Sequence, residues 1–166
     1  AAIGHVRYST TGKSTLVNAQ PLTFSGRLGP MALAHNGNLV NSPEIRTQLE
    51  QQGSIFQTST DSEVVAHLLA RSTTTDLDGA LVSALGQVRG AYAMLILTPD
   101  RLLAIRDPHG IRPLVLGKYN GGWVAASETC ALDTVGADFI REVEPGEMVS
   151  LSSAGLQSFP LFPPRK

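Results

Sequence analysis

The chain has 166 residues, of which 42% are hydrophobic and 16% charged, and its formal net charge is -1. This balance predicts one soluble globular domain with a substantial core, and it excludes the basic footprint of a protein that binds nucleic acid or anionic membranes. No apolar run approaches the length of a membrane span. The single cysteine, Cys130, excludes an internal disulfide and is typical of a reducing cytosol. We therefore expect a cytoplasmic protein without nucleic-acid or membrane partners.

The first half of the chain predicts two short strands followed by three helices. Ser42 is expected to cap the first helix, and Pro43 suits its first turn. Thr60 and Glu63 have the spacing of a capping box at the start of the second helix. The strands are expected over 3–8 and 31–34, and the helices over 41–53, 59–72 and 75–90.

The second half of the chain predicts mainly strands, separated by turn signals such as Asn120-Gly121. A short helix with Ser127 as its N-cap is expected over 127–136. Strands are expected over 91–97, 101–107, 113–119, 122–127 and 146–152. Because strands and helices are segregated, the sequence predicts an α+β fold with mostly antiparallel sheet. Consecutive residues of these strands, which point to opposite faces, are both apolar. This pattern indicates burial on both faces, as between the layers of a sandwich.

The stretch LAHNGNLVN, residues 33–41, has two interpretations. Asn-Gly is the favoured pair of a type I′ turn, so the local pattern favours a hairpin. Alternatively, the side chain of Asn36 and the backbone N–H of Gly37 could converge on one oxygen as an oxyanion hole.

Three polar clusters, at 7–12, 35–38 and 58–63, lie at the ends of apolar elements. Each has an ordinary explanation: a strand-end charge at Arg7, a turn at Asn36-Gly37, and a carboxylate in the first helical turn at Asp61. Together they suit a free α-amino acid, with Arg7 on its carboxylate and Asp61 on its ammonium. Asn36 and Gly37 would then lie where a side-chain carbonyl becomes a tetrahedral oxyanion.

No residue of the chain stands out as the nucleophile for such a site. Cys130 has no base beside it in the sequence, and a buried structural thiol is the favoured interpretation. The four histidines lack the spacing of metal ligands, so no metal site is expected.

Seven segments together resemble the glutaminase domain of the amidophosphoribosyltransferase family, over essentially the whole chain. They are GHVRYSTTG, LAHNGNLVN, FQTSTDSEV, GAYAMLIL, RDPHGIRPL, ASETCALD and REVEPGEM. The resemblance implies an N-terminal-nucleophile hydrolase fold, a four-layer αββα sandwich of antiparallel sheets. It also implies that Arg7 and Asp61 bind glutamine, that Asn36 and Gly37 form the oxyanion hole, and that Thr10 lines the same pocket.

The family uses an N-terminal cysteine as nucleophile, whereas residue 1 here is Ala. We therefore expect residues 1–166 to be an incomplete glutaminase domain that lacks its first strands and, alone, is inactive. The whole enzyme would add a phosphoribosyltransferase domain, form a homo-oligomer, and use Mg²⁺ with phosphoribosylpyrophosphate. One cysteine cannot hold an iron–sulfur cluster. The alternatives are a glucosamine-6-phosphate-forming amidotransferase, which RDPHGIRPL disfavours, and a non-catalytic amino-acid-binding relic.

Overall fold

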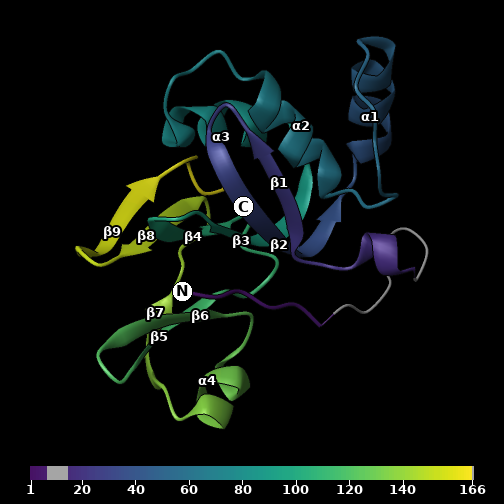
Figure 1. The fold of residues 1–166 in the computed structure, drawn as a ribbon. Coiled ribbons are helices and arrows are strands. Elements are labelled where there is room, and N and C mark those ends of the chain that lie inside the picture. The colour runs from purple at the N-terminus through teal and green to yellow at the C-terminus, as the bar shows by residue number, and fades with distance from the viewer. Residues whose placement is uncertain (7–14, 166) are drawn as a thin grey trace.

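A computed structural model describes residues 1–6 and 15–165 of the chain. Arg7 and Thr10 therefore lie outside the described residues, as does the end of the strand expected over 3–8, whose residues 3–6 form no regular strand. Figure 1 shows the elements in chain order. They are the 3-10 helix η1 (Leu16–Asn18), the helices α1 (Ser42–Gln51), α2 (Glu63–Arg71), α3 (Leu77–Leu85) and α4 (Thr129–Val135), and the strands β1 (Leu22–Gly26), β2 (Gly29–Leu39), β3 (Gly90–Leu97), β4 (Arg101–Arg106), β5 (Val115–Tyr119), β6 (Gly122–Ala126), β7 (Asp138–Glu142), β8 (Glu147–Ser152) and β9 (Gly155–Pro160).

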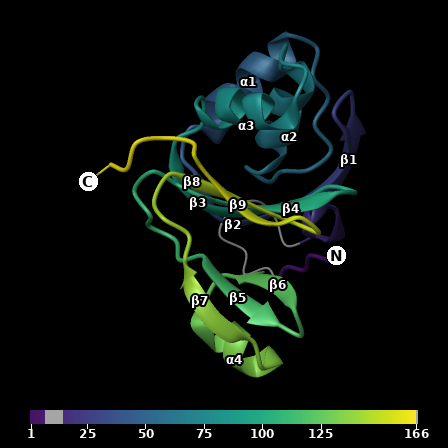
Figure 2. The same cartoon turned by 90° about the vertical axis from the view of Figure 1, so that its left-hand side faces the viewer.

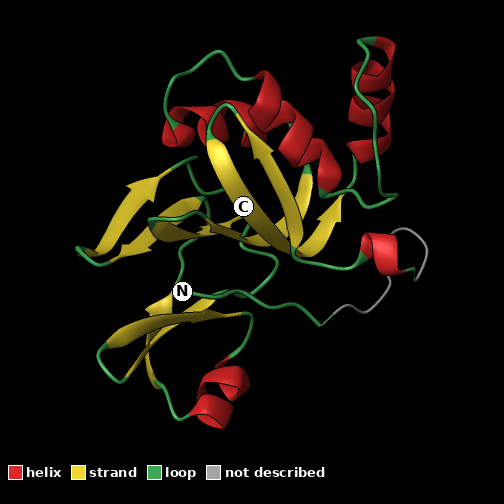
Figure 3. Cartoon of the chain, in the orientation of Figure 1, coloured by secondary structure: helices red, strands yellow, loops and turns green. Residues whose placement is uncertain are grey.

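The strands form two antiparallel sheets that are stacked between helices. One sheet has the order β1-β2-β3-β4-β8-β9 and the other has the order β6-β5-β7. Figures 2 and 3 show α1, α2 and α3 over the outer face of the larger sheet and α4 beyond the smaller sheet. This is the α+β fold that the sequence predicted, with the four αββα layers that the resemblance implied. None of the helices in the described ranges is long and apolar enough to cross a lipid bilayer.

The apolar side chains of β3 and β4 alternate between the two faces of the larger sheet. Met94 and Ile105 pack against the helices in the main core, whereas Ala93 and Ala104 pack toward the smaller sheet. A third, smaller cluster around Leu132 joins α4 to the smaller sheet. The burial on both faces that the sequence predicted for these strands is confirmed.

The helix starts differ by a residue or two from the expected ones. Asn41, rather than Ser42, is the N-cap residue of α1, and Glu128, rather than Ser127, is that of α4. The prediction of a capping box at α2 is wrong. The helix begins at Glu63, and Ser62, its N-cap residue, makes no side-chain cap hydrogen bond. Glu63 instead accepts hydrogen bonds from the segment that leads into the helix.

The hairpin interpretation of HNGN is also wrong. Residues 35–38 lie inside β2, which runs straight through them and pairs with β3, Asn36 opposite Ala93 and Gly37 opposite Tyr92. The type I′ geometry occurs instead at Asn120 and Gly121, which both have positive φ and join β5 to β6.

Candidate glutamine site

A cavity of about 760 Å³ lies between the two sheets and brings together three of the residues singled out in the sequence. Asn36 and Gly37 reach it from β2, and Asp61 reaches it from the segment before α2. Arg7 and Thr10, the other two, lie outside the described residues. The rest of the described wall is formed by Gly4, His5, Val6, Gln20, Ala34, His35, Thr60, Ala93, Leu95, Arg112, Leu114, Ala125, Ala126, Ser127 and Ala131.

The backbone N–H of Gly37 is directed away from β3. The N–H groups on either side of it, those of His35 and Leu39, donate to Gln20 Oε1 and Asp61 Oδ2 on that outer edge of β2. Amides of a strand alternate in direction, so the N–H of Gly37 points the same way as these two. Tyr92, opposite Gly37, exchanges its own hydrogen bonds with Asp107 on the far side of β3. The N–H of Gly37 thus points toward the edge of β2 where Gln20 and Asp61 lie.

Asn36 presents its side chain to the opposite face of β2 from that of His35. Asn36 pairs with Ala93, whose side chain packs between the two sheets. Residues directly opposite in an antiparallel pair share a face, so Asn36 projects into the space that forms the cavity. The amide side chain and the neighbouring glycine N–H therefore both border this cavity.

Gly37 has a backbone that disfavours any residue with a side chain. Its φ is +151°, and a Cβ built there would overlap the carbonyl oxygen of Ala91. It would also come within 2.8 Å of His35 Nε2. The glycine lets β2 and β3 pair closely while keeping the strand edge at the cavity.

Asp61 lies two residues before α2 rather than in its first turn, where the sequence placed it. It is buried, and its Oδ2 accepts the N–H of Leu39 at 2.8 Å. Its Oδ1 lies 3.4 Å from the hydroxyl of Ser62. A carboxylate has about four lone-pair sites, so these contacts anchor Asp61 to β2 and leave it acceptor capacity for a ligand in the cavity.

His35 also borders the cavity, although its side chain lies on the opposite face of β2 from that of Asn36. From the sequence it was considered only as a possible metal ligand. Its Nδ1 is 2.9 Å from Ser62 Oγ and 3.8 Å from Asp61 Oδ2. Burial lowers the pKa of His35, and the charge of Asp61 opposes this only in part. The ring is therefore neutral and braces the Asp61-Ser62 corner. Recognising residues 35–37 as strand would have placed His35 on one face with Gly37.

Arg112 contributes a cation to the cavity wall, and its backbone is held by a buried arginine. Arg106 donates to the carbonyls of Gly110, Arg112 and Val143 at 2.9, 2.8 and 2.7 Å. The carboxylate of Asp107 accepts the N–H groups of His109 and Ile111 in the same turn. The RDPHGIRPL segment, 106–114, is thus a turn beside the cavity that is held by hydrogen bonds of Arg106 and Asp107.

Cys130 is not the buried thiol that the sequence favoured. It is exposed on α4, with Sγ 3.6 Å from Glu128 Oε2. In residues 1–6 and 15–165, no group of three or more His, Cys, Asp or Glu side chains is placed to hold a metal ion.

The two stacked sheets between helices are the fold of the N-terminal-nucleophile hydrolases, and comparison with known families agrees with this class. The profile of the family described as "Glutamine amidotransferase domain" matches residues 5–134, so the chain belongs to that family. Within the family it is most usefully compared with amidophosphoribosyltransferases. The Bacillus subtilis (strain 168) enzyme is 52% identical over 158 residues, which are 95% of this chain and 33% of that protein. Amidophosphoribosyltransferase 2, chloroplastic, of Arabidopsis thaliana is 51% identical over 163 residues, 98% of this chain and 29% of that protein.

Solved structures confirm the expected fold. The glutamine phosphoribosylpyrophosphate amidotransferase from B. subtilis, complexed with ADP and GMP, superposes with a TM-score of 0.89 at 49% identity, over 95% of this chain and 34% of that one. A glutamine aminotransferase class-II domain protein from Silicibacter pomeroyi, at 23% identity and a TM-score of 0.63 over 86% of this chain and 70% of that one, shares the fold. The chain spans about a third of the length of the curated relatives it matches.

Proposed function

We propose that this chain is the glutamine-hydrolysing part of an amidophosphoribosyltransferase. Such an enzyme releases ammonia from glutamine and transfers it to phosphoribosylpyrophosphate, forming 5-phosphoribosylamine, pyrophosphate and glutamate in the first committed step of purine synthesis. The observation that carries the proposal is the single cavity in which Asn36, Gly37 and Asp61 meet. The identity of about one residue in two with amidophosphoribosyltransferases supports the choice of reaction.

The chemistry assigns a role to each of these groups. Asp61 would bind the ammonium of glutamine, and a thiolate, which the family supplies from an N-terminal cysteine, would attack the side-chain amide carbon. The developing oxyanion would accept hydrogen bonds from the side chain of Asn36 and the N–H of Gly37. One such donor contributes about 3 kcal/mol of transition-state stabilisation. Arg7 would bind the α-carboxylate and Thr10 would line the pocket, as predicted from the resemblance.

The magnesium expected with phosphoribosylpyrophosphate has no ligand set among the described residues. The ion therefore receives no residue here, and none of the roles above depends on it.

The first alternative is an amidotransferase that forms glucosamine 6-phosphate. The relatives compared above are amidophosphoribosyltransferases, which favours phosphoribosylpyrophosphate as the acceptor. The second alternative is a non-catalytic amino-acid-binding domain. It predicts that the full-length protein binds glutamine without releasing glutamate.

The test compares two activities of the full-length protein, glutamine-dependent and ammonia-dependent synthesis of phosphoribosylamine. Asp61→Ala and Arg7→Ala each remove a charge-assisted contact, so glutamine use should fall about 10- to 100-fold. Ammonia-dependent synthesis should persist, because free ammonia bypasses the cavity. Asp133→Ala, which removes an exposed carboxylate on α4, serves as the matched control. Equal loss of both activities in folded protein would contradict the assignment.

A further inference from the structure

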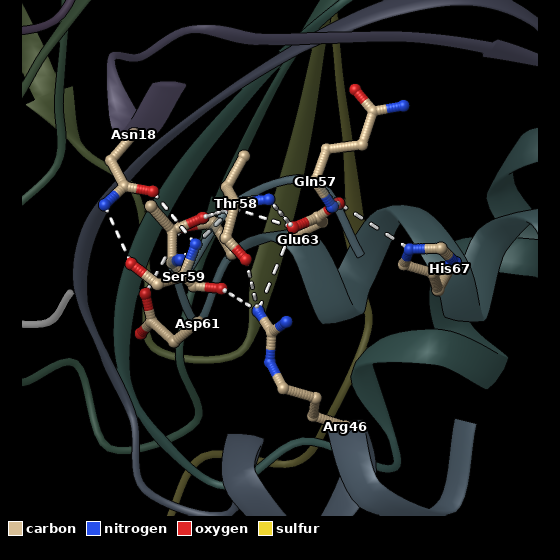
Figure 4. A network of polar contacts seen from close by, with 10 residues as sticks. Asn18, Arg46, Gln57, Thr58, Ser59, Asp61, Glu63 and His67 are labelled. Atoms are coloured by element: carbon tan, nitrogen blue, oxygen red, sulfur yellow. Dashed lines mark hydrogen bonds and ion pairs between the residues drawn. The ribbon is translucent and has the colours of Figure 1, made fainter. Parts of the chain in front are cut away.

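The segment 57–60, which leads to Asp61, is held by hydrogen bonds from side chains that do not line the cavity. Figure 4 shows the polar network around residues 57–60. The carboxylate of Glu63, a buried residue, accepts the N–H groups of Gln57 and Thr58, each at 2.8 Å, and the hydroxyl of Thr58 at 2.7 Å. One side chain of α2 thus holds three donors of the segment that precedes its own helix.

Arg46 of α1 holds the acceptors of the same segment. One nitrogen of its guanidinium donates to the carbonyls of Thr58 and Thr60 at 3.0 and 3.1 Å, and lies 3.8 Å from Glu63 Oε2. Its guanidinium carbon lies 3.9 Å from the centre of the Phe56 ring, which limits its freedom to move. Arg46 and Glu63 therefore bind complementary groups of one short stretch of backbone.

The network ends one peptide bond from Asp61. The carbonyl of Thr60, bound by Arg46, belongs to the peptide that joins Thr60 to Asp61. On the other side, Asn18 forms two hydrogen bonds with Ser59, at 2.8 and 2.9 Å. Neither Arg46 nor Glu63 lines the cavity, so neither touches a molecule bound there.

We infer that Glu63 and Arg46 are positioning residues for the binding of glutamine, and that they act through Asp61. Together they set the distance between the Asp61 carboxylate and the Asn36-Gly37 pair, which must match the length of one amino acid. The inference rests on the proposed function. It adds that recognition of the ammonium depends on a partly buried ion pair between α1 and α2 that has no contact with the substrate.

Two substitutions perturb the network with little change in volume. Glu63→Gln leaves one acceptor oxygen and directs an NH₂ group at an N–H donor, so at least one of the three hydrogen bonds is lost. Arg46→Lys keeps the charge but loses the planar fork and its stacking on Phe56. Each change should let the 57–61 segment shift without removing any group from the cavity.

Steady-state kinetics of the full-length protein provide the test. For both variants we expect the KM for glutamine to rise about tenfold, with kcat and ammonia-dependent synthesis nearly unchanged, because only binding of the ground state is weakened. A purely structural role would instead lower both activities together and leave the KM for glutamine as it was. Asp78→Asn is the matched control, since its ion pair with Arg101 joins α3 to β4 away from the cavity.

A double-mutant cycle separates this inference from the proposed function. If Glu63 acts through Asp61, Glu63→Gln should add little once Asp61→Asn has already raised the KM. A full additive effect of Glu63→Gln in the Asp61→Asn background would overturn the inference while leaving the proposed function intact. An unchanged KM in Asp61→Asn alone would overturn both. Should Glu63→Gln fail to fold, Arg46→Lys carries the same cycle.

Discussion

Gly37 combines two requirements that no other residue type meets together. Its N–H must face the cavity edge of β2, and its α-carbon must fit beneath the carbonyl of Ala91. A side chain at this φ would be strained in addition to the overlap. The backbone can relieve both only by moving β2 away from β3, and that movement would redirect the N–H.

Gly37→Ala should therefore impair chemistry more than binding. We expect kcat for glutamine hydrolysis to fall about 100-fold or more, which corresponds to roughly 3 kcal/mol of lost oxyanion stabilisation. The KM for glutamine should change little, because Asp61 and Arg7 are untouched. The measurement is glutamate release by the full-length protein. Gly26→Ala on β1 is the control, because a Cβ there meets no atom within 4 Å. A Gly37→Ala variant with wild-type kcat would rule out the N–H as a donor.

Residue types in the candidate site could be predicted from the sequence, but their backbone setting could not. Asn36, Gly37 and Asp61 were identified because their chemistry suits an amino acid, and the structure places all three at one cavity. The prediction of a turn at Asn36-Gly37 was wrong because the preference of a residue pair for a turn is a local property. The pairing of β2 with β3, which decides the backbone here, joins residues more than fifty positions apart. The predicted burial of Cys130 was wrong for a related reason, because burial depends on packing that the neighbouring sequence does not encode.

At the scale of elements, the strands that the sequence missed share one property. β1, β7 and β9 all lie at the edge of a sheet. β7 and β9 have no buried residue, so their apolar pattern is weak. The central strands β3 and β4, buried on both faces, were found without difficulty. To identify an edge strand one must know which strand it pairs with, and a single sequence carries little information about that pairing.

Glu147, the first residue of β8, links β7 of the smaller sheet to β8 and β9 of the larger sheet. Its carboxylate accepts two hydrogen bonds from Arg141 of β7, at 2.7 and 2.8 Å, and one from the hydroxyl of Ser158 on β9. Burial alone would raise the pKa of Glu147, but the hydrogen bonds from Arg141, Ser158 and the N–H of Glu144 outweigh it and hold the pKa below the ordinary value. The ionised form is therefore favoured by folding.

Glu147→Gln should destabilise the protein by about 2 kcal/mol at pH 7, because Arg141 loses its charged partner in a partly buried setting. A lowered carboxyl pKa contributes stability above the unfolded value, about 4.3, and loses it as pH falls through the folded value. The difference between the wild type and the variant should therefore shrink below pH 4. Urea unfolding at pH 7 and at acidic pH measures this, with exposed Glu50→Gln as control. A difference that stays constant with pH would contradict the argument.

At the scale of the whole molecule, the two sheets have unequal support. The larger sheet packs on α1, α2 and α3 through an extensive core that includes Leu33, Leu81 and Ile96. The smaller sheet packs on the larger one through a smaller cluster that includes Leu116, and on α4 through a cluster around Leu132. The cavity lies between a strongly held layer and a weakly held one. Asn36, Gly37 and Asp61 come from β2 and the segment before α2, in the first layer, and Arg112 precedes β5 of the second.

This asymmetry predicts two levels of protection from hydrogen exchange in the full-length protein. Amides of β3 and β4 should exchange only by global opening, whereas those of β6 and α4 should exchange by a local opening of lower free energy. Leu132→Ala should lower the local value further, by about 2–4 kcal/mol, because it empties the centre of the small cluster. Exchange in β3 and β4 should stay as it was. Hydrogen–deuterium exchange with mass spectrometry resolves the two regions. Uniform acceleration across both sheets by Leu132→Ala would show instead that they open as one cooperative unit, and the cavity would then have two equally rigid walls.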